Sequence, residues 1–455
     1  MGVVVVESLL VPPCEETPSR GLWLSALDLV HAKRGHTPTV YLYRRPTDSD
    51  DFFDVDRLKA SLAKTLVSFY PVAGRLGADA HGRPQINCAG QGVHLVIARS
   101  SDLTVDELST YQPSPEVKRL FVPRIIDEEF PTVMCAVQVT FLACGGVAFG
   151  TALHHAVIDG VSAFSFFKTW AALSRDMDAD LPDLPFHDRT LLRARDPPVP
   201  FVADVANEAA QKKEGPVVQE IFAIPRDKVA DLKRACSSGP AGTVSTFCAV
   251  GAHVWRCMCI ARRLSPDATT LFTFPANFRR SLTPPLPDTY FGNAIMELEA
   301  AAKVADIVAA EATEEHLASI AANVRDATRS IGNELVRSKI DRLEVDSQTG
   351  ALQKPGGMPA TEVRVVSWLG MPVYHADFGW GKPLMMMRAE QQHAGVVYFM
   401  DGGQGDGSVN VMCTETPETL DDFRRLLYAS LDKLSSIPSP CCTHPAPSVP
   451  LREVY

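Results

Sequence analysis

The hydrophobic positions in the first part of the chain alternate between strand spacing and helix spacing. Residues 39–43 are β-branched and aromatic, which favours a strand. Residues 55–69 repeat apolar side chains every three or four positions, which predicts an amphipathic helix. The positions on its apolar face are Leu58, Leu62, Leu66 and Phe69.

A second set of signals follows around residues 133–173. Residues 133–142 alternate in strand fashion, a Cys-Gly-Gly turn follows, and residues 147–153 return as an apolar strand. Residues 161–173 then take up helical spacing. The run His-His-Ala-Val-Ile-Asp-Gly at 154–160 therefore falls at a predicted strand-to-helix junction, where a rigid scaffold can present a reactive side chain.

The second half carries weaker signals. Prolines recur over 180–200, a composition that resists regular structure. Residues 243–263 are helix-like, a long amphipathic stretch covers about 303–335, and strand signals resume at 363–368 and 395–400. We therefore expect an N-terminal domain, a crossover linker, a C-terminal domain and a flexible tail. Their expected bounds are 1–180, 181–215, 216–434 and 435–455.

Length and composition narrow the class. A chain of 455 residues exceeds the size of one hydrophobic core, and 46% hydrophobic with 22% charged residues is ordinary for globular proteins. The net charge of -10 opposes binding to nucleic acid or to anionic membranes. No apolar stretch is long enough to span a bilayer, and the N-terminus lacks the pattern of a signal peptide. We expect a cytoplasmic monomer.

The His-His-x-x-x-Asp-Gly run admits three readings. A metal site would need further ligands at suitable spacing, and the eleven cysteines offer none, so no metal is predicted. Two histidines beside an apolar strand could also be hydrogen-bonded structural groups. Alternatively, His155 could act as a general base, because an imidazole accepts a proton near neutral pH without a large shift of its pKa.

A second motif separates these readings. Residues 377–383 read Asp-Phe-Gly-Trp-Gly-Lys-Pro, residues 290–293 Tyr-Phe-Gly-Asn, and residues 37–41 Thr-Pro-Thr-Val-Tyr. Together with the His-His-x-x-x-Asp-Gly run, these three segments closely resemble the plant BAHD acyltransferases over nearly the whole chain. The His-His-x-x-x-Asp-Gly run alone is also shared by chloramphenicol acetyltransferase and by the condensation domains of peptide synthetases. The nearest branch is that of hydroxycinnamoyl-CoA transferases. The resemblance implies an α/β fold of two chloramphenicol-acetyltransferase-like domains, each a mixed β-sheet with flanking helices, with a solvent channel between them.

The resemblance implies roles for the first motif. His155 would be the general base in the channel. Asp159 would point away from the substrates and hold the motif by pairing with an arginine, for which Arg279 is the candidate. Gly160 would let the chain turn tightly into the helix.

The resemblance also implies roles for the second motif. Asp377 would organise its loop, with Gly379 as part of the turn. Trp380 would either donate its indole N–H to the tetrahedral intermediate or pack as an interface aromatic. Asp377 and Trp380 are both counted with His155 as catalytic candidates.

Substrate positions follow from the same resemblance. Ser245, Thr246 and Arg280 would line the CoA entrance, although the second arginine of the family pattern is displaced in residues 277–281. Thr39 and Tyr41 would approach the acyl or acceptor group. No permanently bound cofactor is expected, and acyl-CoA is the co-substrate.

The acceptor is indicated by residues 367–372, Ser-Trp-Leu-Gly-Met-Pro. In shikimate transferases the corresponding segment is similar to Thr-Trp-Thr-Arg-Leu-Pro. The resemblance implies that their arginine holds the acceptor carboxylate. Here that position is Gly370, which favours an aliphatic amine such as putrescine, agmatine or spermidine. Three alternatives stay open: acylation of shikimate, quinate or another alcohol, a condensation-like domain using carrier-bound acyl groups, and a non-catalytic binding protein.

Overall fold

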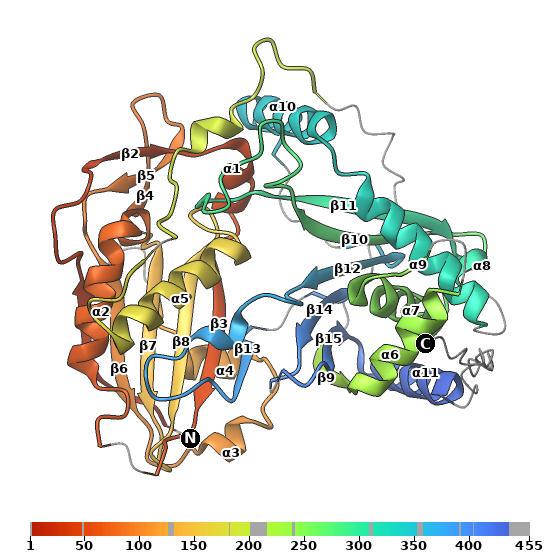
Figure 1. Ribbon diagram of the computed structural model, residues 1–455, viewed down its shortest axis with the longest axis horizontal. Helices are drawn as coiled ribbons and strands as arrows, with labels where there is room; N and C mark the ends of the chain where they lie inside the picture. Colours follow the sequence, from red (N-terminus) through yellow and green to blue (C-terminus); the bar gives the residue numbers. More distant parts are fainter. Residues whose placement is uncertain are drawn as a thin grey trace, which may run out of the picture.

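Two six-stranded sheets form the framework of the molecule (Figure 1). The computed structural model describes residues 2–47, 50–125, 132–181, 183–200, 216–238, 242–308, 313–352, 358–390, 393–403 and 405–435. The N-terminal sheet has the order β1 (Val4–Val11), β6 (Val93–Arg99), β7 (Cys135–Phe141), β8 (Val147–His154), β3 (His36–Tyr43) and β13 (Met385–Arg388). A three-stranded sheet beside it has the order β2 (Arg20–Trp23), β5 (Pro84–Cys88) and β4 (Arg75–Ala78).

The C-terminal sheet is mixed as well. Its order is β11 (Ile295–Lys303), β10 (Thr269–Asn277), β12 (Glu362–Ser367), β14 (Val396–Asp401), β15 (Val409–Glu415) and β9 (Val218–Ile224). Strands β10, β12 and β14 are parallel to one another, so their carboxyl ends reach the same edge of the sheet. The fold is thus the predicted α/β arrangement with two sheet-containing domains.

The helices flank these sheets. Those of the N-terminal half are α1 (Ala26–Ala32), α2 (Val55–Ser68), α3 (Val105–Leu108), α4 (Pro115–Phe121) and α5 (Gly160–Arg175). Those of the C-terminal half are α6 (Arg226–Cys236), α7 (Thr246–Ala261), α8 (Val304–Ile307), α9 (Glu314–Arg329), α10 (Asn333–Thr349) and α11 (Pro417–Ser435). Within the described ranges, no helix is both long enough and apolar enough to cross a membrane.

Several sequence predictions are confirmed. The helix predicted over 55–69 is α2, and its leucines Leu58, Leu62 and Leu66 are fully buried. The predicted hairpin is the antiparallel pair β7 and β8. The helix after the histidines is α5, which packs against α2. These elements share one apolar core, in which aromatic side chains dominate.

The stretch expected over 303–335 is divided. It contains α8, α9 and the start of α10 rather than one element. Thr313 begins α9 by accepting a hydrogen bond from the backbone N–H of His316, and Gly332 precedes α10 in an extended conformation. The spacing of apolar residues alone does not indicate where these two helices begin.

The second half of the chain returns once to the first sheet. β13 pairs antiparallel with β3, so the segment that links β12 to β14 crosses into the N-terminal half (Figure 1). The expected C-terminal domain of 216–434 therefore contributes one strand to its neighbour. Of the expected linker, the structure describes 181 and 183–200, and the expected tail beyond Ser435 lies outside the described residues.

Candidate active site

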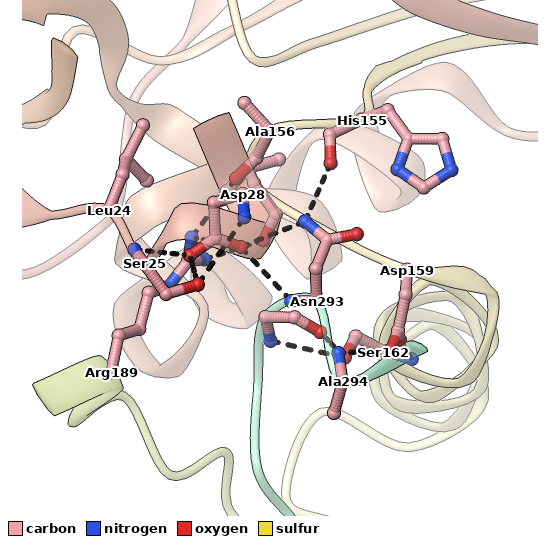
Figure 2. A network of polar contacts seen from close by, with 12 residues as sticks. Leu24, Ser25, Asp28, His155, Ala156, Asp159, Ser162, Arg189, Asn293 and Ala294 are labelled. Carbon is pink, nitrogen blue, oxygen red and sulfur yellow. Dashed lines mark hydrogen bonds and ion pairs between the residues drawn. The ribbon is translucent and has the colours of Figure 1, made fainter. Parts of the chain in front are cut away.

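His155 lies directly after β8, between that strand and α5. Its backbone N–H donates to the carbonyl of Gly35 at 3.0 Å, and its own carbonyl accepts from Asn293 Nδ2 at 2.8 Å. Figure 2 shows the imidazole turned away from the polar network that holds this carbonyl. The residue is half-buried, and these two hydrogen bonds fix its backbone.

Burial lowers the pKa of His155 below its ordinary value of 6.5. The charges of Arg34 and Arg388 lower this pKa further, whereas a hydrogen bond to the residue's own carbonyl and the charge of Asp159 oppose the fall. His31 stacks on the ring at 4.0 Å between centroids. The ring is therefore neutral at pH 7 and able to accept a proton.

The two ring nitrogens differ in their surroundings. Nδ1 of His155 is enclosed and has no partner in another described residue. A hydrogen bond from Nδ1 to the residue's own carbonyl would place the proton there, which leaves the lone pair on Nε2. Since Nδ1 is enclosed, we expect Nε2 to be the nitrogen that takes a proton from an incoming nucleophile.

Asp159 is the N-cap of α5 and joins the two halves of the molecule. Its Oδ1 accepts from the backbone N–H of Ser162 at 2.9 Å, and its carboxylate pairs with Arg279 through contacts of 2.8 and 3.0 Å. Both charged groups are almost completely buried. The guanidinium holds the pKa of Asp159 below its ordinary value despite the opposing effect of burial. The ion pair expected from the resemblance is therefore present.

A second buried network fixes the carbonyls of the histidine motif (Figure 2). Asp28 in α1 accepts from Asn293 Nδ2 at 2.8 Å and pairs with Arg189 Nη1 at 3.2 Å. Arg189 in turn donates to the carbonyls of Ala156 and Val157 at 3.0 and 2.6 Å. Three segments that are distant in the sequence thereby hold the loop that carries His155.

Gly160 does not have the role expected for it. Its φ is not in the left-handed region, and a Cβ there would meet only Met371, with Sδ at 3.5 Å, an ordinary contact distance. The entry into α5 therefore does not require glycine for its backbone conformation. The turn is fixed instead by the capping carboxylate of Asp159.

The loop of residues 377–381 is organised by its own aspartate. Asp377 Oδ1 accepts from the backbone N–H groups of Gly379 and Gly381 at 2.9 and 3.0 Å. Arg57 of α2 donates to the carbonyl of Phe378 at 2.9 Å. One carboxylate oxygen therefore holds two backbone N–H groups of the loop. This is a direct structural basis for the predicted organising role of Asp377.

This loop lies at the far end of α5 from His155. Ser174 donates to the carbonyl of Phe378, and Arg175 donates to that of Asp377, both at the C-terminal end of the helix. A helix of 16 residues spans about 24 Å. A hydrogen bond from Trp380 to an intermediate beside His155 is not supported by this placement.

Trp380 is instead a packed aromatic. Its ring stacks on Phe53 at 5.0 Å and lies under the guanidinium of Arg57, 4.3 Å from the ring centroid. Its Nε1 is enclosed and has no hydrogen-bond partner among the described residues. The second motif therefore fastens α2 and α5 together, and the catalytic assignments of Asp377 and Trp380 find no support in the geometry.

Replacing Gly379 with alanine is expected to disrupt this loop. Gly379 has φ +107, and a Cβ there would lie 2.0 Å from Arg57 Nη2. The backbone strain costs about 1–3 kcal/mol, and displacing Arg57 also removes its bond to Phe378. Urea unfolding of Gly379→Ala should show a clear loss of stability. Gly381→Ala is the matched control, since φ is +101 but nothing lies within 4 Å, so only the strain applies.

Thr39 and Tyr41 do not reach an open site. Thr39 Oγ1 lies 2.6 Å from Thr151 Oγ1, and both side chains are buried. Tyr41 is 1% exposed and packs against Phe149 and Phe167, and this burial raises the pKa of its hydroxyl. The expected substrate contact of Tyr41 is therefore not supported, because its side chain belongs to the core.

The residues expected at the CoA entrance are at the surface of the C-terminal half. Ser245 is exposed and caps α7 by accepting from the backbone N–H of Cys248, and Thr246 begins the helix. Arg280 is exposed and pairs with Asp288 at 3.3 Å. Within the described ranges, no side-chain hydrogen bond or ion pair connects Arg280 with Ser245 or Thr246, so the CoA role of these residues stays a prediction.

Sequence reasoning did not single out Asp28, His31, Arg189 or Arg388. Ser25 and Asp28 form a capping box, a signal that predicts a helix start but not a contact with Asn293 in the other half. Arg189 lies in the proline-rich stretch, where no periodicity marks a buried residue. Among the described residues, no group of three potential metal ligands is present.

Comparisons with known proteins find relatives along nearly the whole chain. The model of the Transferase family matches residues 1–429. Putrescine hydroxycinnamoyltransferase 1 of Oryza sativa subsp. japonica is 43% identical over 95% of this chain and 100% of its own length. Shikimate O-hydroxycinnamoyltransferase of Nicotiana tabacum is 34% identical over 94% of this chain and 100% of its length.

Solved structures share the fold. Vinorine synthase superposes with a TM-score of 0.73 at 23% identity, covering 94% of this chain and 98% of its own. TRI101 of F. graminearum in complex with ethyl coenzyme A superposes with a TM-score of 0.74 at 18% identity, covering 88% and 96%. At these identities the likeness establishes the fold alone.

Proposed function

Because the chain belongs to the BAHD family of acyltransferases, whose co-substrate is acyl-CoA, we propose that it transfers a hydroxycinnamoyl group from CoA to an amine of an aliphatic polyamine. Putrescine, agmatine and spermidine are the candidate acceptors. The observation that carries the proposal is the neutral, half-buried imidazole of His155 on a backbone fixed from three segments.

In the proposed reaction the amine nitrogen attacks the thioester carbonyl, and His155 Nε2 takes the proton that the nitrogen loses. The new C–N bond forms as the C–S bond breaks, and the electron pair of that bond leaves with the CoA sulfur. The imidazolium proton then passes to the thiolate or to water. Asp159 and Arg279 act only by holding the loop, since their charges are already paired with each other.

The acceptor class rests on Gly370 and on the relative from rice. Gly370 stands where shikimate transferases have an arginine. This position therefore offers no cation to bind an acceptor carboxylate. The putrescine transferase from rice is 43% identical along nearly the whole chain. We further propose that the enzyme works in the cytoplasm as a monomer, without a permanently bound cofactor.

The acceptor proposal predicts the outcome of a substrate panel. With p-coumaroyl-CoA, the kcat/KM for putrescine or agmatine should exceed that for shikimate and quinate by at least about tenfold, because the cation that pairs a carboxylate is missing at Gly370. Release of free CoA thiol measures each rate. Turnover of shikimate well above every amine would reject the amine proposal while leaving the acyl transfer intact.

O-acylation is the second candidate. Arg34 and Arg388 lie close enough to His155 for their charges to lower its pKa. Cations at this point could also attract an acceptor that bears a carboxylate. The relative from tobacco, which is 34% identical to this chain, is named for shikimate, an acceptor that bears a carboxylate.

A further inference from the structure

One edge of the C-terminal sheet faces the histidine motif. Arg279, just beyond β10, pairs with Asp159 at the start of α5. Met371 lies just beyond β12. Its Sδ would be 3.5 Å from a Cβ added to Gly160, so the two residues are close neighbours. Since β10, β12 and β14 are parallel, the end of β14 lies at this same edge. Ligands of open α/β sheets commonly bind at the carboxyl ends of the strands.

Asp401 is the last residue of β14. Its Oδ2 accepts from the backbone N–H of Gly370 at 2.7 Å, and its side chain stays half-buried. Burial, followed by the charge of Asp401, raises the pKa of Tyr374 nearby. Beside it, Gly370 has φ +71, and no atom lies within 4 Å of where its Cβ would be. The carboxylate is therefore hydrogen-bonded to an exposed backbone position that carries no side chain.

Asp401 differs from the other carboxylates around His155. Asp28 is paired with Arg189, and Asp159 with Arg279, so neither has a free negative charge. In the described parts of the chain, Asp401 has no arginine or lysine partner and is held by a neutral N–H. A carboxylate in that situation retains the capacity to bind a cation.

Two arginines contribute positive charge near His155, and the charge of Asp159 acts against them. Arg34 and Arg388 act on the imidazole electrostatically, and the same positive charge disfavours an ammonium at the reacting nitrogen. It favours the free amine, which is the form that attacks a thioester. A diamine would therefore react at its neutral end, with its other, charged end held away from these arginines.

We propose that Asp401 binds the distal ammonium or guanidinium of the acceptor while the near nitrogen reacts at His155. This inference rests on the proposed amine acylation and names the residue that selects a diamine over a monoamine. The distal cation would form a charge-assisted hydrogen bond with the carboxylate, whose Oδ2 is oriented by Gly370.

Asp401→Asn tests the proposal. Asparagine can still accept from the N–H of Gly370, so the variant removes the charge and keeps the local hydrogen bond. With p-coumaroyl-CoA, KM for putrescine should rise about 10–100-fold with kcat within about twofold. KM for butylamine, which lacks the distal charge, should not change. Asp401→Glu should keep most of the preference for putrescine.

Asp406→Asn is the matched control. Asp406 accepts from Ser408 in the loop before β15 and should leave both KM values unchanged. An Asp401→Asn enzyme with the wild-type KM for putrescine, or with equal increases for putrescine and butylamine, would overturn the role of Asp401. Wild-type enzyme that acylates no amine would overturn the proposed function itself, and the role of Asp401 with it.

Discussion

Replacing His155 with alanine is expected to lower kcat by about 10²–10⁴-fold, the usual contribution of a general base. The enzyme would still hold both substrates, but nothing would remove the proton from the attacking nitrogen. KM should change little, because the backbone contacts of His155 to Gly35 and Asn293 do not depend on its side chain. Steady-state release of CoA thiol measures the effect.

The control for this experiment is His81→Ala. His81 lies in the exposed turn between β4 and β5, so losing its imidazole should leave kcat unchanged. Thermal unfolding of the His155 variant should stay close to wild type, since the residue is half-buried and, within the described ranges, its ring stacks on His31 alone. Wild-type kcat in the His155 variant would assign proton removal to another group.

Replacing Asp159 with alanine is expected to lower the free energy of unfolding by about 3–5 kcal/mol. The change leaves the guanidinium of Arg279 buried without its carboxylate, and it also removes the N-cap of α5 and the acceptor for Ala294. Activity should fall as well, because the loop that carries His155 loses its fixed end. Urea unfolding followed by tryptophan fluorescence measures the stability.

The matched control is the neighbouring ion pair of Arg280 and Asp288. Their side chains are 83% and 74% exposed, so Asp288→Ala should cost less than about 1 kcal/mol. The two experiments compare adjacent arginines that differ in burial. Equal small losses in both variants would show that the Asp159 pair does not bind the two halves together.

Periodic segments were predictable from the sequence because their signals are local. The apolar face of α2, the hairpin of β7 and β8, and the placement of His155 before α5 follow from short patterns. The Asp159 and Arg279 pair was also anticipated, but only through the resemblance to a family. Spacing alone does not relate two residues in different halves of the chain.

The remaining parts depend on contacts that leave no local pattern. Arg189 lies in a proline-rich stretch, yet it is 1% exposed and holds two carbonyls of the histidine motif. The return of β13 to the N-terminal sheet places the second motif at the far end of α5. Trp380 was considered as a catalytic donor because it is part of the second motif. A sequence motif gives no information about the distance between Trp380 and His155.

Chemical rescue of the His155→Ala enzyme tests the central claim most directly. Turnover of p-coumaroyl-CoA and putrescine by this variant is measured as imidazole is added, with wild-type enzyme as the reference. If the missing ring is the base, imidazole should raise the variant's rate in proportion to its concentration and leave the wild type unaffected. A folded variant that loses no activity, or that imidazole does not restore, would contradict proton transfer at His155.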